Sequence, residues 1–222
     1  MIAHFKARTD ILPSAQRCLW PELRGIPGLD FTLYGGTGIA LRLGHRDSID
    51  FDFFSEQPLD RPAIRAALPF LGQATALQDH GDAWVVLVPV ERGDVKISFF
   101  GGIDFGRVGE PEFTDDQVLQ VASLDDLMAT KLKVILQRAE AKDYRDIAAM
   151  VGAGVDLARG LASARLLFGP NFQPSESLKA LVYFDDGDLR TLTAIEKKTL
   201  VDAVQSIRDL PQVEVKSARL GL

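Results

Sequence analysis

Residues 34–55 read YGGTGIALRLGHRDSIDFDFFS, and three features of this stretch decide the fold that we expect. A glycine turn, Gly35-Gly36-Thr37, comes first. The apolar segment that follows is predicted to form a helix from Thr37 to Leu43, ended by Gly44. From Ser48 to Phe54, acidic and apolar residues alternate, and this pattern predicts a strand. We therefore expect a turn, a short helix and a strand in direct succession.

The predicted strand carries two carboxylates on one face. Alternate side chains of an extended chain share a face, so Asp50 and Asp52 point to the same side. The apolar side chains of Ile49, Phe51 and Phe53 point to the other side. Two neighbouring carboxylates repel each other unless a cation lies between them. A hard divalent cation suits such a pair, with Mg²⁺ as the first choice and Mn²⁺ as the alternative.

The glycine turn is a candidate phosphate site. Where a turn leads into a helix, the backbone N–H groups of residues such as Gly35 and Gly36 are available to an anion. Thr37 adds a hydroxyl donor. Taken singly, a Gly-Gly pair is usually a plain turn and an acidic strand face is usually solvated. Together, a phosphate cradle and paired aspartates are what metal-assisted transfer from a nucleotide requires.

The same residues resemble a known family. The glycine turn, short helix, GHR and DFDFFS string is similar to the AbiEii/AbiGii toxin family of nucleotidyltransferases, within the DNA polymerase β-like superfamily. In that superfamily a Gly-Ser or Gly-Thr turn precedes a helix and a strand with Asp-x-Asp. Gly36 and Thr37 match the turn, and Asp50 and Asp52 match the metal pair. Arg46 is a candidate phosphate ligand, with pairing to Asp47 or to an active-site carboxylate as equal alternatives.

Composition bounds the class of protein. The 222 residues are 46% hydrophobic and 25% charged, as in ordinary globular proteins. The net charge of −6 argues against a general nucleic-acid coat, which would be basic. The single cysteine, Cys18, excludes an intrachain disulfide and a cysteine-cluster metal site. We expect no membrane partner and a cytoplasmic location, because no long apolar run and no secretory signal core are visible.

The order of predicted elements indicates an α+β fold. We expect a nucleotidyltransferase core domain over residues 1–122 and a helical domain over residues 123–222 that completes the cleft. The resemblance implies a polymerase β-like core with a mixed or antiparallel sheet flanked by helices. In the first domain we predict a helix over 10–24 broken near Pro21, a helix opened by Asp60, and strands at 31–34, 74–78, 83–90, 94–100 and 118–120. In the second we predict helices at 124–138, 142–152, 156–167, 175–183 and 191–208.

A third carboxylate is missing where the family resemblance would place it. Polymerase β-like transferases usually carry it on a strand beside the aspartate pair, where it helps to hold a second metal and can accept a proton. The matching strand is Asp94–Phe100, and the aligned position is Ser98. Asp94 shares a strand face with Ser98 but lies about 13 Å away along the strand. The departure puts full two-metal catalysis in doubt and leaves nucleotide binding less affected.

A second motif resembles the family further along the chain. Its pattern is a lysine-bearing helix, an arginine and K/R-D-x-x-D, which here are Lys131, Arg138 and Lys142-Asp-Tyr-Arg-Asp146. We expect Lys131 to contact the triphosphate and neutralise the leaving phosphates, assisted by Arg138 or Lys142. For Asp146, an ion pair that positions Lys131 and a direct catalytic role remain equal alternatives.

The resemblance implies a Mg²⁺-dependent nucleotidyltransferase that moves a nucleoside monophosphate from a nucleoside triphosphate to an acceptor hydroxyl. RNA or tRNA is one candidate acceptor and protein is another. The chain would be the toxin of a type IV-like toxin–antitoxin or abortive-infection pair, with a cognate antitoxin as its partner. A non-catalytic nucleotide-binding module on the same fold is the main alternative. A metal-dependent nuclease is a third, opposed by the phosphate turn and by Ser98.

Overall fold

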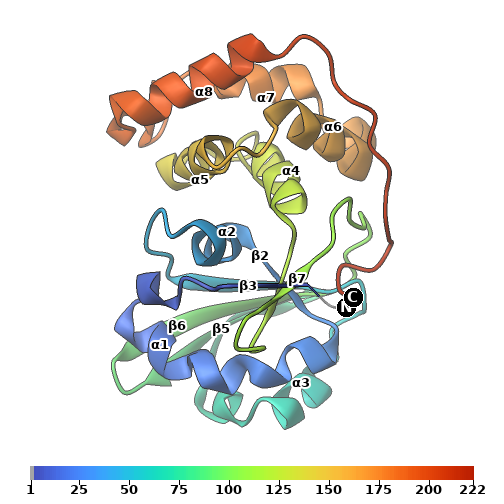
Figure 1. Cartoon of the computed structure of the whole chain (residues 1–222). Helices are drawn as coiled ribbons and strands as arrows, with labels where there is room; N and C mark the ends of the chain where they lie inside the picture. The colour runs from blue at the N-terminus through green and yellow to red at the C-terminus, as the bar shows by residue number, and fades with distance from the viewer. Residues whose placement is uncertain (1–2) are drawn as a thin grey trace. The chain divides into compact units, whose positions relative to one another are not determined.

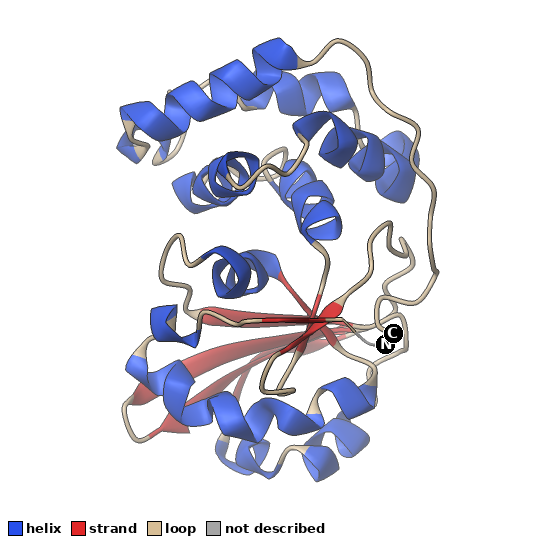
Figure 2. Ribbon diagram, viewed as in Figure 1, coloured by secondary structure: helices blue, strands red, loops and turns tan. Residues whose placement is uncertain are grey.

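The structure, a computed structural model, describes residues 3–222 and divides into two compact units (Figures 1 and 2). Unit 1 comprises the chain as far as Gly106 together with Glu110–Ser123 and Ser217–Leu222. Unit 2 comprises Arg107–Gly109 and Leu124–Lys216. The division near residue 123 falls where the sequence places the change from sheet to helix. The chain's last residues, however, return to unit 1.

Unit 1 is built on an eight-stranded sheet with the strand order β1-β7-β8-β2-β3-β6-β5-β4. Parallel pairs join β1 to β7, β8 to β2 and β3 to β6, and the remaining pairs are antiparallel. This mixed sheet confirms the predicted α+β class and agrees with a polymerase β-like core. The strands are β1 (His4–Phe5), β2 (Thr32–Tyr34), β3 (Asp50–Phe54), β4 (Thr75–His80), β5 (Ala83–Val90), β6 (Gly93–Phe100), β7 (Glu112–Thr114) and β8 (Gln120–Val121).

One face of this sheet forms the hydrophobic core. Phe51 and Phe53 on β3 are fully buried and stack on each other, and Phe53 also stacks on Phe99 of β6. The helices α1 (Ser14–Leu19) and α3 (Arg61–Ala67) cover this face (Figure 1). The helix α2 (Gly35–Leu43) lies on the opposite face (Figure 1). Because side chains alternate along β3, Asp50 and Asp52 point to the α2 side.

Most local predictions for unit 1 are confirmed, and two strands are new. The expected break near Pro21 occurs where α1 gives way to a 3-10 helix, Trp20–Gly25. Asp60 caps α3 as predicted, with Oδ1 accepting from the Ala63 N–H at 3.0 Å. Strands β1 and β7 were not predicted, because each is too short to show a period in sequence. Further 3-10 turns occur at Thr9–Ile11, Pro27–Leu29 and Pro69–Gln73.

Unit 2 is helical, as predicted. Its helices pack in the pairs α4 with α6, α4 with α5, α5 with α8, and α6 with α7. Thr193 and Glu196 form a complete capping box at the start of α8. The first helix ends at Val134, before the predicted Arg138. The helices are α4 (Leu124–Val134), α5 (Ala141–Gly152), α6 (Leu157–Phe168), α7 (Pro174–Ala180) and α8 (Ala194–Ser206), with 3-10 turns at Gly169–Asn171 and Leu189–Thr191.

No helix within residues 3–222 combines the length and the apolar character that a bilayer span requires.

The close packing of α4 and α6 depends on Gly160, where an added Cβ would lie 2.3 Å from Met128 Cγ. Met128 is itself fully buried, so this atom has little room to move.

We predict that Gly160→Ala destabilises unit 2 by about 1–3 kcal/mol, because the new methyl group overpacks the α4–α6 contact. Urea unfolding followed by circular dichroism measures the change. Gly152→Ala is the matched control, since nothing lies within 4 Å of a Cβ at that position. Equal unfolding free energies for the two variants would contradict this account of the packing.

Candidate active site

The N-terminus of α2 meets β3 through a glycine that no other residue replaces easily. Gly35 has a φ of +72°, and a Cβ built there would lie 2.6 Å from Asp52 Oδ2. Tyr34, the N-cap residue, supplies no side-chain cap to the helix. The first N–H groups of a helix have no partner within it, so those of Gly35, Gly36 and Thr37 suit an anion. The structure thus brings the predicted phosphate turn and one predicted metal ligand together.

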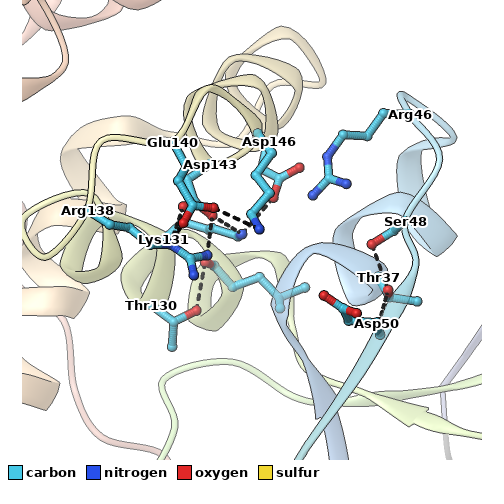
Figure 3. Close-up of polar contacts among 12 residues, drawn as sticks. Thr37, Arg46, Ser48, Asp50, Thr130, Lys131, Arg138, Glu140, Asp143 and Asp146 are labelled. Carbon is cyan, nitrogen blue, oxygen red and sulfur yellow. Dashed lines mark hydrogen bonds and ion pairs between the residues drawn. The ribbon is translucent and has the colours of Figure 1, made fainter. Parts of the chain in front are cut away.

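Thr37 ties the turn to the aspartate strand. Its hydroxyl donates to the carbonyl oxygen of Asp50 and lies 2.7 Å from the hydroxyl of Ser48 (Figure 3). The residue is 1% exposed. These bonds occupy the hydroxyl that the sequence suggested as a phosphate donor. Thr37 therefore positions α2 against β3, and its backbone N–H is the group left for a ligand.

The register of β3 and β6 defines the polar face beside α2. In this parallel pair Asp50 lies across from Lys96, and Asp52 lies across from Ser98. Ser98 therefore lies beside Asp52, at the position where the family resemblance would place the third carboxylate. Asp94 pairs with Pro89 on the other neighbouring strand, beyond the end of the aspartate strand, and does not replace it.

Lys96 is a residue of this face that sequence reasoning missed. Its Nζ lies 3.1 Å from Asp50 Oδ2, and the two side chains are 40% and 28% exposed. The alternation in Asp94-Val-Lys96-Ile-Ser98 was the available signal, because it places Lys96 on the face of Ser98. Only the strand register shows that this lysine lies across from Asp50.

The number of carboxylates on this face suits Mg²⁺ or Mn²⁺. Among residues 3–222, no cluster of three or more His, Cys, Asp or Glu side chains has metal-binding geometry. Mg²⁺ commonly binds one or two protein carboxylates and completes its shell with water and substrate phosphates. Asp50 and Asp52 on one face, beside a helix N-terminus, meet that requirement.

Arg46 follows the C-terminal end of α2. Its Nη1 donates to the backbone carbonyl of Asp47 at 2.9 Å, so the contact with Asp47 is not a carboxylate ion pair. The turn before it is set by Gly44, which ends α2 in the left-handed conformation with a φ of +64°.

In unit 2, Lys131 lies between two buried carboxylates. Its Nζ is 2.6 Å from Asp143 Oδ1 and 2.7 Å from Asp146 Oδ2, and both aspartates are 0% exposed (Figure 3). Arg138 Nε donates to Asp143 Oδ2 at 2.8 Å. Asp146 therefore forms an ion pair with Lys131, as one of the two alternatives for this residue expected. The charge of Lys131 is compensated within unit 2.

Asp143 is held ionised by these cations. Burial is the largest single influence and opposes the charge, but the hydrogen bond from Arg138 and the charge of Lys131 together outweigh it. The pKa of Asp143 is therefore lowered. Arg138 and Lys142 remain about half exposed, at 44% and 47% of their side chains, and both approach Glu140. These are the cations of the second motif that keep access to solvent.

We predict that Gly35→Ala destabilises unit 1 by about 1–3 kcal/mol, because an alanine is strained at positive φ and its methyl group meets the Asp52 carboxylate. Urea unfolding tests this, with Gly28→Ala as the control. Gly28 has open space at the Cβ position and no positive φ. An unchanged unfolding free energy for Gly35→Ala would be inconsistent with the observed approach of Asp52.

We predict that Asp143→Asn destabilises unit 2 by about 3 kcal/mol at neutral pH, because it leaves buried Lys131 short of a counter-charge. The folded pKa of Asp143 lies below its unfolded value of about 3.9. Its contribution is therefore complete above about pH 4 and is lost as the pH falls through the folded pKa. Wild type should lose more stability on acidification than Asp143→Asn. The exposed Asp185→Asn is the control, and equal acid losses would refute the prediction.

Comparison with known proteins identifies the family of this chain. A protein-family model described as "Nucleotidyl transferase AbiEii toxin, Type IV TA system" matches residues 23–214. A protein of Aquifex aeolicus (strain VF5), named "Uncharacterized protein aq_aa25", is 32% identical over 160 residues, which are 71% of this chain and 75% of that protein. The residues that the family model matches include the glycine turn, the aspartate strand and the lysine-bearing helix. The chain therefore belongs to the AbiEii family of nucleotidyltransferase toxins of type IV toxin–antitoxin systems.

Proposed function

We propose that this protein is a Mg²⁺-dependent nucleotidyltransferase that moves a nucleoside monophosphate from a nucleoside triphosphate to an acceptor hydroxyl. One observation carries the proposal. Asp50 and Asp52 share a sheet face, and the glycine N-terminus of α2 approaches Asp52 so closely that a Cβ at Gly35 would collide with it. The proposed metal pair and the proposed phosphate-binding backbone thus belong to one compact unit, which supports the proposal.

The residues of unit 1 divide the work by their chemistry. Asp50 and Asp52 hold the metal, and the N–H groups of Gly35, Gly36 and Thr37 bind phosphate oxygens. When bound, Mg²⁺ neutralises charge that develops on the α-phosphate. The Thr37 hydroxyl keeps α2 against β3, so the phosphate site and the carboxylates hold a constant spacing.

The reaction forms one bond and breaks one. The acceptor oxygen bonds to the α-phosphorus, the bond between the α-phosphorus and its bridging oxygen breaks, and pyrophosphate leaves. Ser98 offers no ionised carboxylate for the hydroxyl proton, so we propose that this proton passes to solvent. That route is slower than transfer to a positioned base.

The cations of the second motif contribute in two ways. Arg138 and Lys142 are exposed enough to contact phosphates of a nucleotide or of an RNA acceptor. Lys131 and Asp146 act as positioning residues that hold α4 against α5, because their charges are already paired with each other inside unit 2. Arg46 remains a candidate phosphate ligand. We propose cytoplasmic RNA, tRNA or protein as the acceptor, and a cognate antitoxin as the partner that the family implies.

We predict that Asp50→Asn lowers nucleotide transfer at least about 100-fold, because it removes a charged metal ligand. The assay incubates the protein with each labelled nucleoside triphosphate, Mg²⁺ and cellular RNA or protein. Asp79→Asn is the control, since Asp79 is exposed and pairs with Arg61 away from β3. Transfer by Asp50→Asn at the wild-type rate would rule out the proposed role of the aspartate pair.

A non-catalytic nucleotide-binding module is the second candidate, and Ser98 across from Asp52 favours it. The same assay separates the two. If wild type binds nucleotide in calorimetry without transfer, and Ser98→Asp does not restore transfer, the binding module is the better description. Transfer by wild type excludes it.

A further inference from the structure

Strand β6 makes the two aspartates of the metal pair unequal. It places the ammonium of Lys96 3.1 Å from Asp50 Oδ2, and it places the neutral hydroxyl of Ser98 across from Asp52. Nothing in the Asp-x-Asp pattern itself distinguishes the two carboxylates. The difference comes from the neighbouring strand, and it concerns the group that the proposed metal must contact.

The ion pair between Lys96 and Asp50 is exchangeable. Both side chains are partly exposed, and an ion pair in that setting contributes little to stability because water screens it. Lys131 differs from Lys96 in its exposure to solvent. Lys131 is almost fully buried between Asp143 and Asp146, so moving it away from them would separate a buried ammonium from both of its carboxylates. Lys96 can leave Asp50 for another anion, whereas Lys131 is fixed.

We propose that Lys96 is a positioning residue that competes with the divalent cation for Asp50. This inference rests on the proposed function. Without nucleotide, the ammonium of Lys96 neutralises Asp50 and repels a second cation, so the metal binds weakly. Nucleotide phosphates attract the ammonium away from Asp50 and supply further oxygen ligands to the metal. Metal binding at this face therefore depends on the nucleotide, and the protein alone holds the metal poorly.

The effect of Lys96 on the affinity for a divalent cation can be measured. An ammonium about 4 Å from a divalent cation in a water-exposed setting opposes its binding by an amount equal to roughly a tenfold change in affinity. We expect Lys96→Met to bind Mn²⁺ about tenfold more tightly than wild type in the absence of nucleotide. Electron paramagnetic resonance of free Mn²⁺ during a titration of the full chain gives this value without requiring turnover.

Matched variants isolate the cause. Lys96→Arg keeps the charge and should bind Mn²⁺ as wild type does. Lys96→Met combined with Asp50→Asn should lose the gain, because the lysine acts through that carboxylate. Arg92→Met removes an equal charge from the turn before β6, about 13 Å along the strand, and should change nothing. Lys96→Gln is the second neutral variant if Lys96→Met fails to fold, and circular dichroism checks each protein.

The outcomes separate this inference from the proposed function. If the neutral Lys96 variants and wild type bind Mn²⁺ equally, or if none of them binds it, the competition is overturned. If the neutral Lys96 variants and wild type bind Mn²⁺ equally and Asp50→Asn abolishes that binding, the competition falls and the metal pair still stands. If Asp50→Asn and Asp52→Asn both bind Mn²⁺ as wild type does, the metal pair itself is wrong and the role of Lys96 falls with it.

Discussion

The hydrogen bond from the Thr37 hydroxyl to the carbonyl of Asp50 joins the two halves of the candidate site in unit 1. It links the first turn of α2 to the first residue of β3 across a short connection. The Thr37 residue is buried, at 1% exposed, so water has little access to its hydroxyl. As a result the backbone of the first turn of α2 and the backbone of Asp50 are held together. The proposed alignment of nucleotide and metal in this unit relies on that spacing.

Unit 2 uses charge where unit 1 uses a neutral hydrogen bond. Two buried carboxylates on α5 meet Lys131 on α4, and Arg138 after α4 adds a second cation to Asp143. An apolar contact would join α4 and α5 at lower desolvation cost. The buried ions instead fix one relative orientation of the helices, because any shift leaves a charge unpaired. Half-exposed Arg138 is held by the same carboxylate, so its guanidinium has a defined direction.

Much of this arrangement was predictable from local pattern. The alternation around Asp50 indicated the strand and its polar face, and Gly44 and Asp60 marked helix ends through backbone chemistry that is local. Three features were not predictable. The contact of Lys96 with Asp50 depends on strand register, the use of the Thr37 hydroxyl depends on how α2 packs, and the contacts of Lys131 depend on how α5 packs against α4. Each is a tertiary property of side chains whose types were already visible.

The lysine–aspartate ion pairs at Lys96 and Lys131 therefore differ in what they can do. Both are lysines beside aspartates, and sequence reasoning singled out Lys131 because the family motif contains it. Burial reverses their functional weight: the paired, buried ammonium is a structural element, and the paired, partly exposed one is free to exchange partners. For the proposed transfer reaction, which admits and releases a highly charged nucleotide in each cycle, an exchangeable cation beside the proposed metal ligand Asp50 is the more useful of the two. In the proposed enzyme, the response to nucleotide would reside in Lys96, while the Thr37 hydrogen bond holds α2 against β3.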